Sequence, residues 1–238
     1  MVWPESAALA AGAWNHPIVA PLQELARGLW RFSRRRQGIP PLATAYALHD
    51  DLGTILVDPL ADARDPDVLE ALDELVRGRV RILVTIPFHV RGSELLWRRW
   101  RDRHEVTIFG HAQCLSRLDD DSGFQPLEGG ELLGGGIRVH TIGRPQRSEM
   151  PFELPSHRAL AFGDTVLEID GQLRVWAEID SERRQAWYEE RFLPTLRPLT
   201  ELDVERVLVT HGEPVVRDGA RVLVECLNRT PWRRTPPR

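Results

Sequence analysis

The stretch ALAFGDTVL, residues 159–167, is an apolar run that is interrupted by Gly163-Asp164. A second run, RVLVT (206–210), is followed in the same way by His211-Gly212. Glycine and aspartate commonly end strands, so either ending alone is typical of an ordinary turn. Both nevertheless put a residue that can bind a metal or move a proton directly after a buried strand.

Three further apolar runs repeat this arrangement. Ligand sites of α/β proteins lie at the carboxyl ends of their strands. Five such endings therefore predict a site at one edge of a sheet, although each also fits simple strand termination. The three runs are TILV (54–57) before Asp58, RILVT (81–85) before His89 and Arg91, and IRVHT (137–141) before Gly143-Arg144.

The remaining patterns indicate a single mixed α/β domain, because no repeat or low-complexity linker divides the 238 residues. Residues 1–40 read as an N-terminal arm with a short helical pattern from Pro17 to Leu29. Residues 41–228 form the expected core, which opens with a β-hairpin of 43–49 and 54–58. The Pro- and Arg-rich end, 229–238, is predicted to be disordered.

Composition excludes several classes of function. All 31 basic residues are arginine, which rules out a Schiff-base, P-loop or pyridoxal-phosphate lysine. The net charge of −4 argues against nucleic-acid binding. Two isolated cysteines, Cys114 and Cys226, have no metal-ligand spacing and suit a reducing compartment. With no long apolar run, the sequence predicts a soluble, cytoplasmic protein without membrane contact.

From about residue 42 to residue 225 the order of these runs resembles the metallo-β-lactamase superfamily. The best-matching stretches are FGDTVL (162–167) and VTHGEP (209–214). The resemblance implies a four-layer αβ/βα sandwich with two mixed β-sheets. It also implies descent from zinc-dependent hydrolases of thioesters, lactones, β-lactams or phosphoesters.

The metal ligands that the resemblance implies are mostly replaced. The family pattern T-H-x-H-x-D-H falls on residues 85–91, where Arg91, a permanent cation, stands at a histidine position. The pattern H-T-P-G-H falls on residues 140–144, so that its ligand histidine is Arg144. Only Asp164 and His211 remain of seven ligand positions, and His89 lies one residue from the family register.

Two functions follow from these departures. In the first, the chain is a pseudoenzyme with a degenerate, metal-free pocket in which Arg91 and Arg144 neutralise Asp164 and bind a small anionic molecule. In the second, it is a hydrolase of ester- or thioester-like substrates. Its catalytic residues would then be His211, Asp164 and His89, either around one metal ion or with His211 as a general base. The sequence favours no bound metal, and zinc if there is one.

Overall fold

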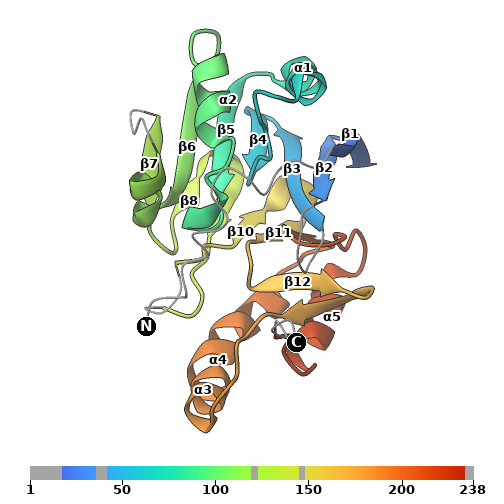
Figure 1. Cartoon of the computed structure of the whole chain (residues 1–238), viewed down its shortest axis with the longest axis vertical. Helices are drawn as coiled ribbons and strands as arrows, with labels where there is room; N and C mark the ends of the chain where they lie inside the picture. Colours follow the sequence, from blue (N-terminus) through green and yellow to red (C-terminus); the bar gives the residue numbers. More distant parts are fainter. Residues whose placement is uncertain (1–17, 36–41, 119–122, 145–147, 234–238) are drawn as a thin grey trace.

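The computed structural model describes residues 18–35, 42–118, 123–144 and 148–233 (Figure 1). Within these residues, strands β1 to β7 form the first sheet in chain order. Neighbouring strands are antiparallel from β1 to β4 and parallel from β4 to β7. The strands are β1 (Ile18–Ala26), β2 (Leu29–Arg35), β3 (Leu42–Asp50), β4 (Gly53–Val57), β5 (Arg79–Val84), β6 (Val106–His111) and β7 (Phe124–Leu127).

Strand β3 shows why this sheet is covered on both faces. Ala43, Ala45 and Ala47 belong to the core under helices α1 and α2, whereas Tyr46 and Leu48 belong to the core between the two sheets. Successive side chains of a strand alternate between its faces. Small residues therefore let the helical layer approach closely, and larger ones fill the space between the sheets. The predicted hairpin is confirmed as β3 and β4.

The second sheet has five strands in the order β14-β11-β10-β9-β8 within the described part of the chain. Strands β11 and β14 are parallel, with Phe162 opposite Val209, so the segments that follow them leave at the same edge. Strands β12 and β13 form a separate two-stranded sheet, which lies below β11 in Figure 1. The bounds are β8 (Leu132–Leu133), β9 (Ile137–Val139), β10 (Phe152–Leu154), β11 (Ala159–Phe162), β12 (Val166–Ile169), β13 (Gln172–Val175) and β14 (Arg206–Val209).

Helices cover the outer face of each sheet. Helix α1 (Pro66–Leu75) begins at a proline. Proline suits the first helical turn because an N–H group there has no acceptor within the helix, so proline loses no hydrogen bond by lacking one. It packs with α2 (Ser93–Trp100) on the first sheet, and α5 (Gly219–Leu227) packs on the second. The shorter helices are η2 (Pro87–His89), η3 (Ala112–Arg117), η4 (Gly134–Gly136), η5 (Pro155–His157), α3 (Glu182–Trp187), the π-helical turn η6 (Tyr188–Phe192), α4 (Leu193–Leu196) and η7 (Arg197–Glu201).

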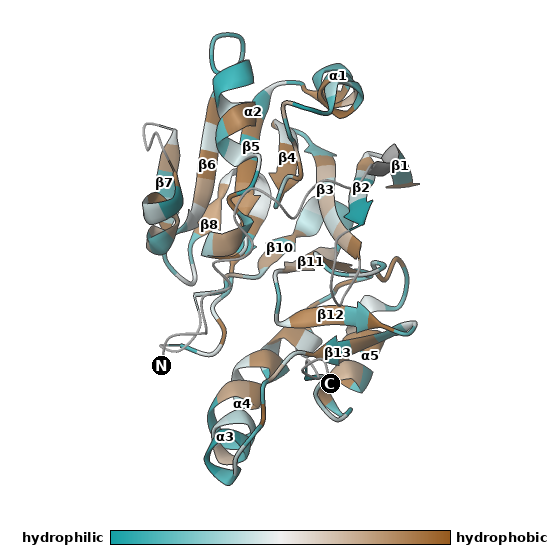
Figure 2. Cartoon of the chain, viewed as in Figure 1, coloured by the Kyte–Doolittle hydropathy of each residue, from teal (hydrophilic) through white to brown (hydrophobic). Residues whose placement is uncertain are grey.

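Three buried clusters separate these layers. One lies between α1, α2 and the first sheet, the next between the two sheets, and the third between the second sheet and the C-terminal helices. Figure 2 shows the matching hydropathy, with apolar residues along the strands and mixed faces on the helices. The predicted four-layer αβ/βα sandwich with two mixed sheets is therefore confirmed.

The N-terminal arm differs from its prediction. Residues 18–35 form the hairpin β1–β2 and extend the first sheet, so the helix expected from Pro17 to Leu29 is wrong within the described residues. Three leucines at helical spacing span barely two turns. Strand pairing stabilises this segment more than so short a helix would. Strand β2 pairs with β3 at seven positions, and Gly28, with a left-handed φ of 76°, forms the turn between β1 and β2. Residues 1–17 and 36–40 of the arm, and residue 41 of the expected core, lie outside the described part.

The C-terminal end also differs from its prediction. Composition indicates a disordered tail from residue 229, but Trp232 is paired with the end of β13. Its N–H donates to the carbonyl of Val175 at 2.8 Å, and its carbonyl accepts the N–H of Ala177 at 3.0 Å. Its ring lies edge-on to Trp176 with 6.0 Å between centroids. Backbone pairing with the end of β13, together with one aromatic contact, thus holds a segment whose composition alone indicates disorder. Residues 234–238 lie outside the described part.

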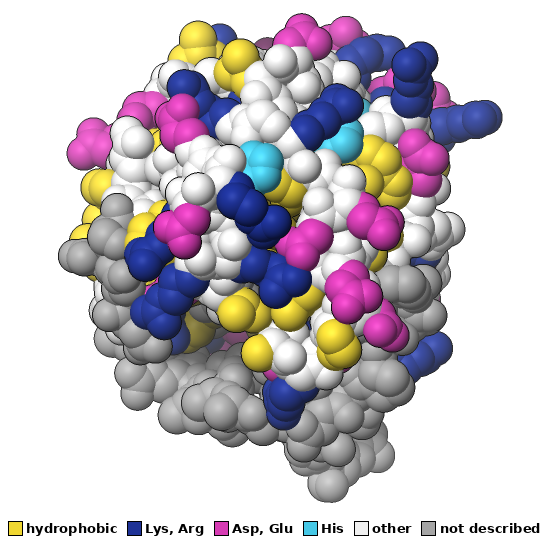
Figure 3. All heavy atoms as spheres, turned by 90° about the horizontal axis from the view of Figure 1, so that it is seen from above, with side chains coloured by type: hydrophobic (Ala, Val, Ile, Leu, Met, Phe, Trp, Pro, Cys, Tyr) yellow, Lys and Arg dark blue, Asp and Glu magenta, His cyan; other side chains and the backbone are white. Residues whose placement is uncertain are grey.

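The face seen from above in Figure 1 carries charges of both signs. Figure 3 shows arginines and carboxylates side by side on it, with histidine side chains among them. Ion pairs such as Arg99 with Asp73 and Arg79 with Glu105 are among those formed by the described residues. Exposed pairs of this kind contribute at most about 1 kcal/mol each, so the fold depends on the buried clusters instead.

Candidate functional site: a His–Asp–His cluster

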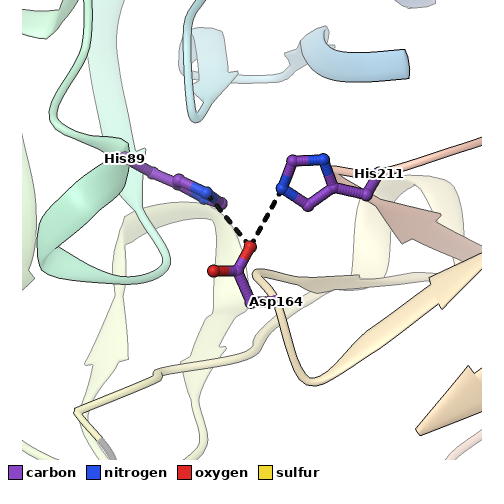
Figure 4. Close-up of side chains that lie close together, drawn as sticks. All are labelled: His89, Asp164 and His211. Carbon is purple, nitrogen blue, oxygen red and sulfur yellow. Dashed lines mark ion pairs between the residues drawn. The ribbon is translucent and has the colours of Figure 1, made fainter. Parts of the chain in front are cut away.

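Three side chains that follow three different strands meet at one place (Figure 4). His89 ends the 3-10 turn η2 after β5, Asp164 follows β11, and His211 follows β14. The Nε2 atoms of His211 and His89 lie 3.1 Å and 3.3 Å from the same oxygen, Oδ1 of Asp164. One nitrogen of each ring and one carboxylate oxygen all lie within 4.8 Å of one another.

The register of the strands explains this meeting. Phe162 and Val209 are opposite each other in parallel strands, so the residues two positions further on emerge side by side. His89 comes from the other sheet, and the backbone joins the two sheets at this point. Met150 donates its N–H to the carbonyl of Thr85 at 2.8 Å, and Thr44 donates to that of Thr210 at 2.9 Å.

Asp58 fixes the ring of His89. The side chain of Asp58 is fully buried, and its Oδ2 lies 2.8 Å from Nδ1 of His89. The same carboxylate accepts the N–H of Thr85 at 2.8 Å and the hydroxyl of Thr85. An ionised carboxylate only accepts hydrogen bonds, so Nδ1 of His89 carries a proton. Nε2 is thereby directed at Asp164.

His211 is oriented by the backbone. Its Nδ1 lies 3.4 Å from the carbonyl oxygen of Leu42, which can only accept. Nδ1 of His211 is therefore the protonated nitrogen, and Nε2 again faces Asp164. Both imidazoles of the cluster consequently present the same nitrogen to one carboxylate oxygen, each held by a partner behind the ring.

The oxygen between the two rings lacks an ordinary partner. Oδ1 of Asp164 is buried and accepts no hydrogen bond of normal geometry from the described residues. Two neutral imidazoles would direct lone pairs at this oxygen, which is repulsive unless a proton or a metal ion lies between them. The side chain as a whole is 27% exposed, so the cluster is open on one side.

The pKa shifts follow from this crowding. Burial and Arg91 lower the pKa of His89, but the carboxylates of Asp58 and Asp164 outweigh them, and the net shift is upward. Burial lowers the pKa of His211, and its contact with Asp164 offsets this only in part. Burial would raise the pKa of Asp164, yet the two imidazoles hold it well below its usual value. Asp164 is therefore an anion at neutral pH, and His211 is neutral.

The donor set fits a divalent metal ion. Zinc binds imidazole nitrogen and carboxylate oxygen at about 2.0–2.2 Å, so tetrahedral ligand atoms lie roughly 3.3–3.5 Å apart. The two Nε2–Oδ1 separations, 3.1 Å and 3.3 Å, are close to this spacing, and all three ligand atoms lie within 4.8 Å of one another. Two histidines and one carboxylate also form the set that leaves an open coordination position. His89, Asp164 and His211 could thus hold one ion.

The two arginines predicted to bind a ligand lie in different surroundings. Arg91 has a left-handed φ of 42° and donates from Nη1 to the backbone carbonyl of Asp58 at 3.3 Å. Arg144 is exposed, and its Nη1 lies 2.9 Å from Nε2 of His111. The ion pairs of Asp164 with described residues are made by the two histidines. The sequence predicts that both arginines neutralise Asp164. Arg144 instead contacts His111, and the two histidines are the ion-pair partners of Asp164.

A second buried carboxylate, which the sequence did not single out, holds the backbone around Asp164. Glu149 is 2% exposed, and its Oε1 accepts the N–H of Gly163 at 2.9 Å. Its Oε2 accepts the N–H of Thr165 at 2.9 Å and the hydroxyl of Thr165 at 2.6 Å. Glu149 stands in the segment RSEMPFE, which has neither a motif nor an apolar period that would distinguish it.

Comparisons with known proteins reveal the fold. No protein-family model and no curated protein matches the sequence. Among solved structures, a β-lactamase domain protein from Burkholderia ambifaria is 19% identical, with a TM-score of 0.62 over 87% of this chain and 74% of that one. A metallo-β-lactamase from Pontibacter korlensis is 12% identical, with a TM-score of 0.61 over 88% and 99%.

A third similar structure belongs to a protein with a different name. It is a fragment of a putative diflavin flavoprotein from Nostoc sp. PCC 7120, 16% identical, with a TM-score of 0.60 over 89% of this chain and 96% of that one. The chain therefore has the metallo-β-lactamase fold. Identities this low carry the fold and nothing about the reaction. Among the described residues, no helix combines the length and apolar character needed to cross a bilayer.

Proposed function

We propose that this chain is a hydrolase of ester- or thioester-like substrates that works through a single divalent metal ion, zinc in the first instance. The observation that carries the proposal is the convergence of two oriented Nε2 atoms on one buried oxygen, Oδ1 of Asp164. The fold supports it, since solved structures of this shape include metallo-β-lactamases.

Charge also favours a cation at the cluster. With both imidazoles neutral, as metal ligands must be, two carboxylates (Asp58 and Asp164) and one guanidinium (Arg91) sum to a net charge of −1. A proton on His89, whose pKa is raised, would bring this sum to zero in the absence of a metal ion. Burying such an excess of negative charge is costly without a counter-ion. Arg144 lies against His111, so its charge is not directed at Asp164 by any described contact. A divalent ion would reverse the sign of the site and attract an anionic substrate.

In this proposal the residues of the site have three roles: they hold the metal ion, orient the imidazole rings and bind the substrate. His89, Asp164 and His211 would hold the ion, which when bound acts as a Lewis acid toward a carbonyl group and toward water. Asp58 and the carbonyl of Leu42 keep the protons of both rings on Nδ1. The open side of Asp164 admits the substrate, and the guanidinium of Arg91 offers a positive charge for a carboxylate or phosphate group on it.

Metal analysis of the purified full chain tests this proposal. We expect about one zinc ion per chain after reconstitution and desalting, given three protein ligands. Asp164→Asn and His211→Ala should lose it. His140→Ala is the matched control, because His140 faces Glu153 at 3.2 Å and is not part of the cluster. Aryl ester and thioester hydrolysis should follow metal content across the series.

A metal content near zero in the reconstituted wild type would overturn the proposal. The same conclusion would follow if Asp164→Asn and His140→Ala retained equal amounts of zinc. Hydrolysis that survives complete removal of zinc would locate the reaction elsewhere.

The position of Arg91 favours a second candidate, a metal-free site that binds a small anion. Its guanidinium lies close enough to lower the pKa of both His89 and His211. In that case a proton shared by His89 and Asp164 takes the place of the ion. Phosphate or a short dicarboxylate should then raise the melting temperature of chelator-treated wild type, but not of Arg91→Ala. An equal shift in both proteins would exclude this candidate.

A further inference from the structure

We infer that Glu149 is a positioning residue that holds Asp164 in line with the two imidazoles, an inference that rests on the proposed metal site. Its carboxylate binds the backbone N–H groups on both sides of Asp164, those of Gly163 and Thr165. The residue between two such anchored amides has little freedom to rotate. Glu149 thus fixes the backbone from which the ligand side chain projects.

The geometry leaves Glu149 no role in direct contact with substrate. It is 2% exposed, and its two oxygens already accept three hydrogen bonds of 2.6–2.9 Å. Charge-assisted bonds of this kind are about twice as strong as neutral ones. The charge therefore matters, because a neutral amide accepts on one atom only and would direct an NH₂ group at the opposing N–H.

Glu149 also connects the anchors of the other two ligands. The next residue, Met150, donates its N–H to Thr85, the residue that Asp58 binds beside His89. On the other side, the hydroxyl of Thr210 donates to the carbonyl of Gly163 at 2.8 Å. Hydrogen bonds thus run under the cluster from the strand before His89 to the residue before His211. In this series of hydrogen bonds, Glu149 supplies the charged group next to Asp164.

Metal affinity measured with Co²⁺ tests the inference, because its visible spectrum reports both occupancy and coordination geometry. We compare wild type with Glu149→Gln and with the control Asp50→Asn, a carboxylate whose side chain is 4% exposed and is paired with Arg81 outside the cluster. Supporting residues behind a metal ligand typically change affinity about 10–100-fold. We expect at least a tenfold loss and an altered spectrum in Glu149→Gln alone.

An affinity within twofold of wild type in Glu149→Gln would overturn the inference, as would an equal loss in Asp50→Asn. If Glu149→Gln does not fold, Thr165→Val and Thr165→Ser replace it. Valine removes the hydroxyl that donates to Oε2 at 2.6 Å, and serine keeps it. Weaker Co²⁺ binding in the valine variant with recovery in the serine variant supports the role. Equal affinities contradict it.

An experiment without metal distinguishes a failure of this inference from a failure of the proposed function. If wild type binds no Co²⁺, the metal site fails, and the coupling of Glu149 to Asp164 is measured by a double-mutant cycle of unfolding free energies. Glu149→Gln and Asp164→Asn should be non-additive, because the first acts through the second. Asp50→Asn and Asp164→Asn should add. Additivity in the first cycle would refute the positioning role whatever the metal does.

Discussion

Replacing Asp58 by asparagine should reverse the tautomer of His89 while preserving the fold. The carboxylate accepts from Nδ1 of His89 at 2.8 Å and from the N–H of Thr85 at 2.8 Å. An asparagine can keep the bond from Thr85 with its oxygen, but its NH₂ group then faces Nδ1. Because an NH₂ group only donates, the His89 proton moves to Nε2, where it donates to Asp164.

The size of the effect follows from these contacts. All three hydrogen bonds to the carboxylate, from His89 and from the N–H and hydroxyl of Thr85, lose their charge assistance. At the His89 contact alone, a bond of about 1.5–3 kcal/mol is exchanged for a neutral one of about 0.5–1.5 kcal/mol. The free energy of unfolding should therefore fall by at least about 1–2 kcal/mol. The consequence for metal is larger, since Nε2 of His89 no longer offers a lone pair. We expect an affinity loss of about 10–100-fold, the range typical of residues that orient a ligand histidine.

Nitrogen NMR of the imidazoles in chelator-treated protein reads the tautomer directly, and urea denaturation reads stability. Asp73→Asn is the matched control. Asp73 accepts from Nε1 of Trp100 at 2.7 Å, far from the cluster in sequence and in the fold. It should lower stability by a similar amount and leave His89 unchanged. A His89 ring that keeps its proton on Nδ1 in Asp58→Asn would refute the reasoning.

Three further outcomes are expected. Burial lowers the pKa of His49 and His157 below the usual 6.5, so their contribution to stability is complete above that pH and is lost as the pH falls from 6.5 through their lowered pKa values. The urea midpoint should be lower at pH 5.5 than at 7.5, and His157→Gln should flatten this dependence. Arg81→Met should cost about 3–5 kcal/mol in urea unfolding, because it leaves the buried carboxylate of Asp50 unpaired; a loss under about 1 kcal/mol would contradict the buried pair. A chain that ends at residue 228 lacks Trp232 and should melt several degrees lower, whereas an unchanged melting curve would mean that the pairing with β13 adds no stability.

Much of the fold could be predicted because its signals are local. Apolar runs such as RILVT and RVLVT identify buried strands, and the order of short motifs indicates the sandwich. The N-terminal hairpin escapes prediction because its stability comes from pairing with β3, which the spacing of Leu22, Leu25 and Leu29 does not encode. The ordered end escapes it because one tryptophan outweighs a disorder-prone composition.

The candidate site was predictable only in part. Asp164 and His211 follow strands that are parallel neighbours, and a strand ending in a polar residue is visible in sequence. The sequence offers His89 beside Asp164 as one alternative, but the dependence of His89 on Asp58 is a matter of three-dimensional packing. Glu149 could not be found, since nothing in a sequence tells which buried carboxylate binds amides 14 and 16 residues away.

The three residues of the His–Asp–His cluster belong to both sheets, so neither half of the domain contains the cluster by itself. A compound that binds there recognises only the completed fold, and its binding energy adds to the stability of the whole chain. At a hundredfold excess over its dissociation constant it contributes about 2.7 kcal/mol. In a domain of this size that raises the melting temperature by roughly 5–10 °C. Thermal screening of metabolite collections, with and without zinc, can therefore identify the natural ligand before any reaction has been assayed.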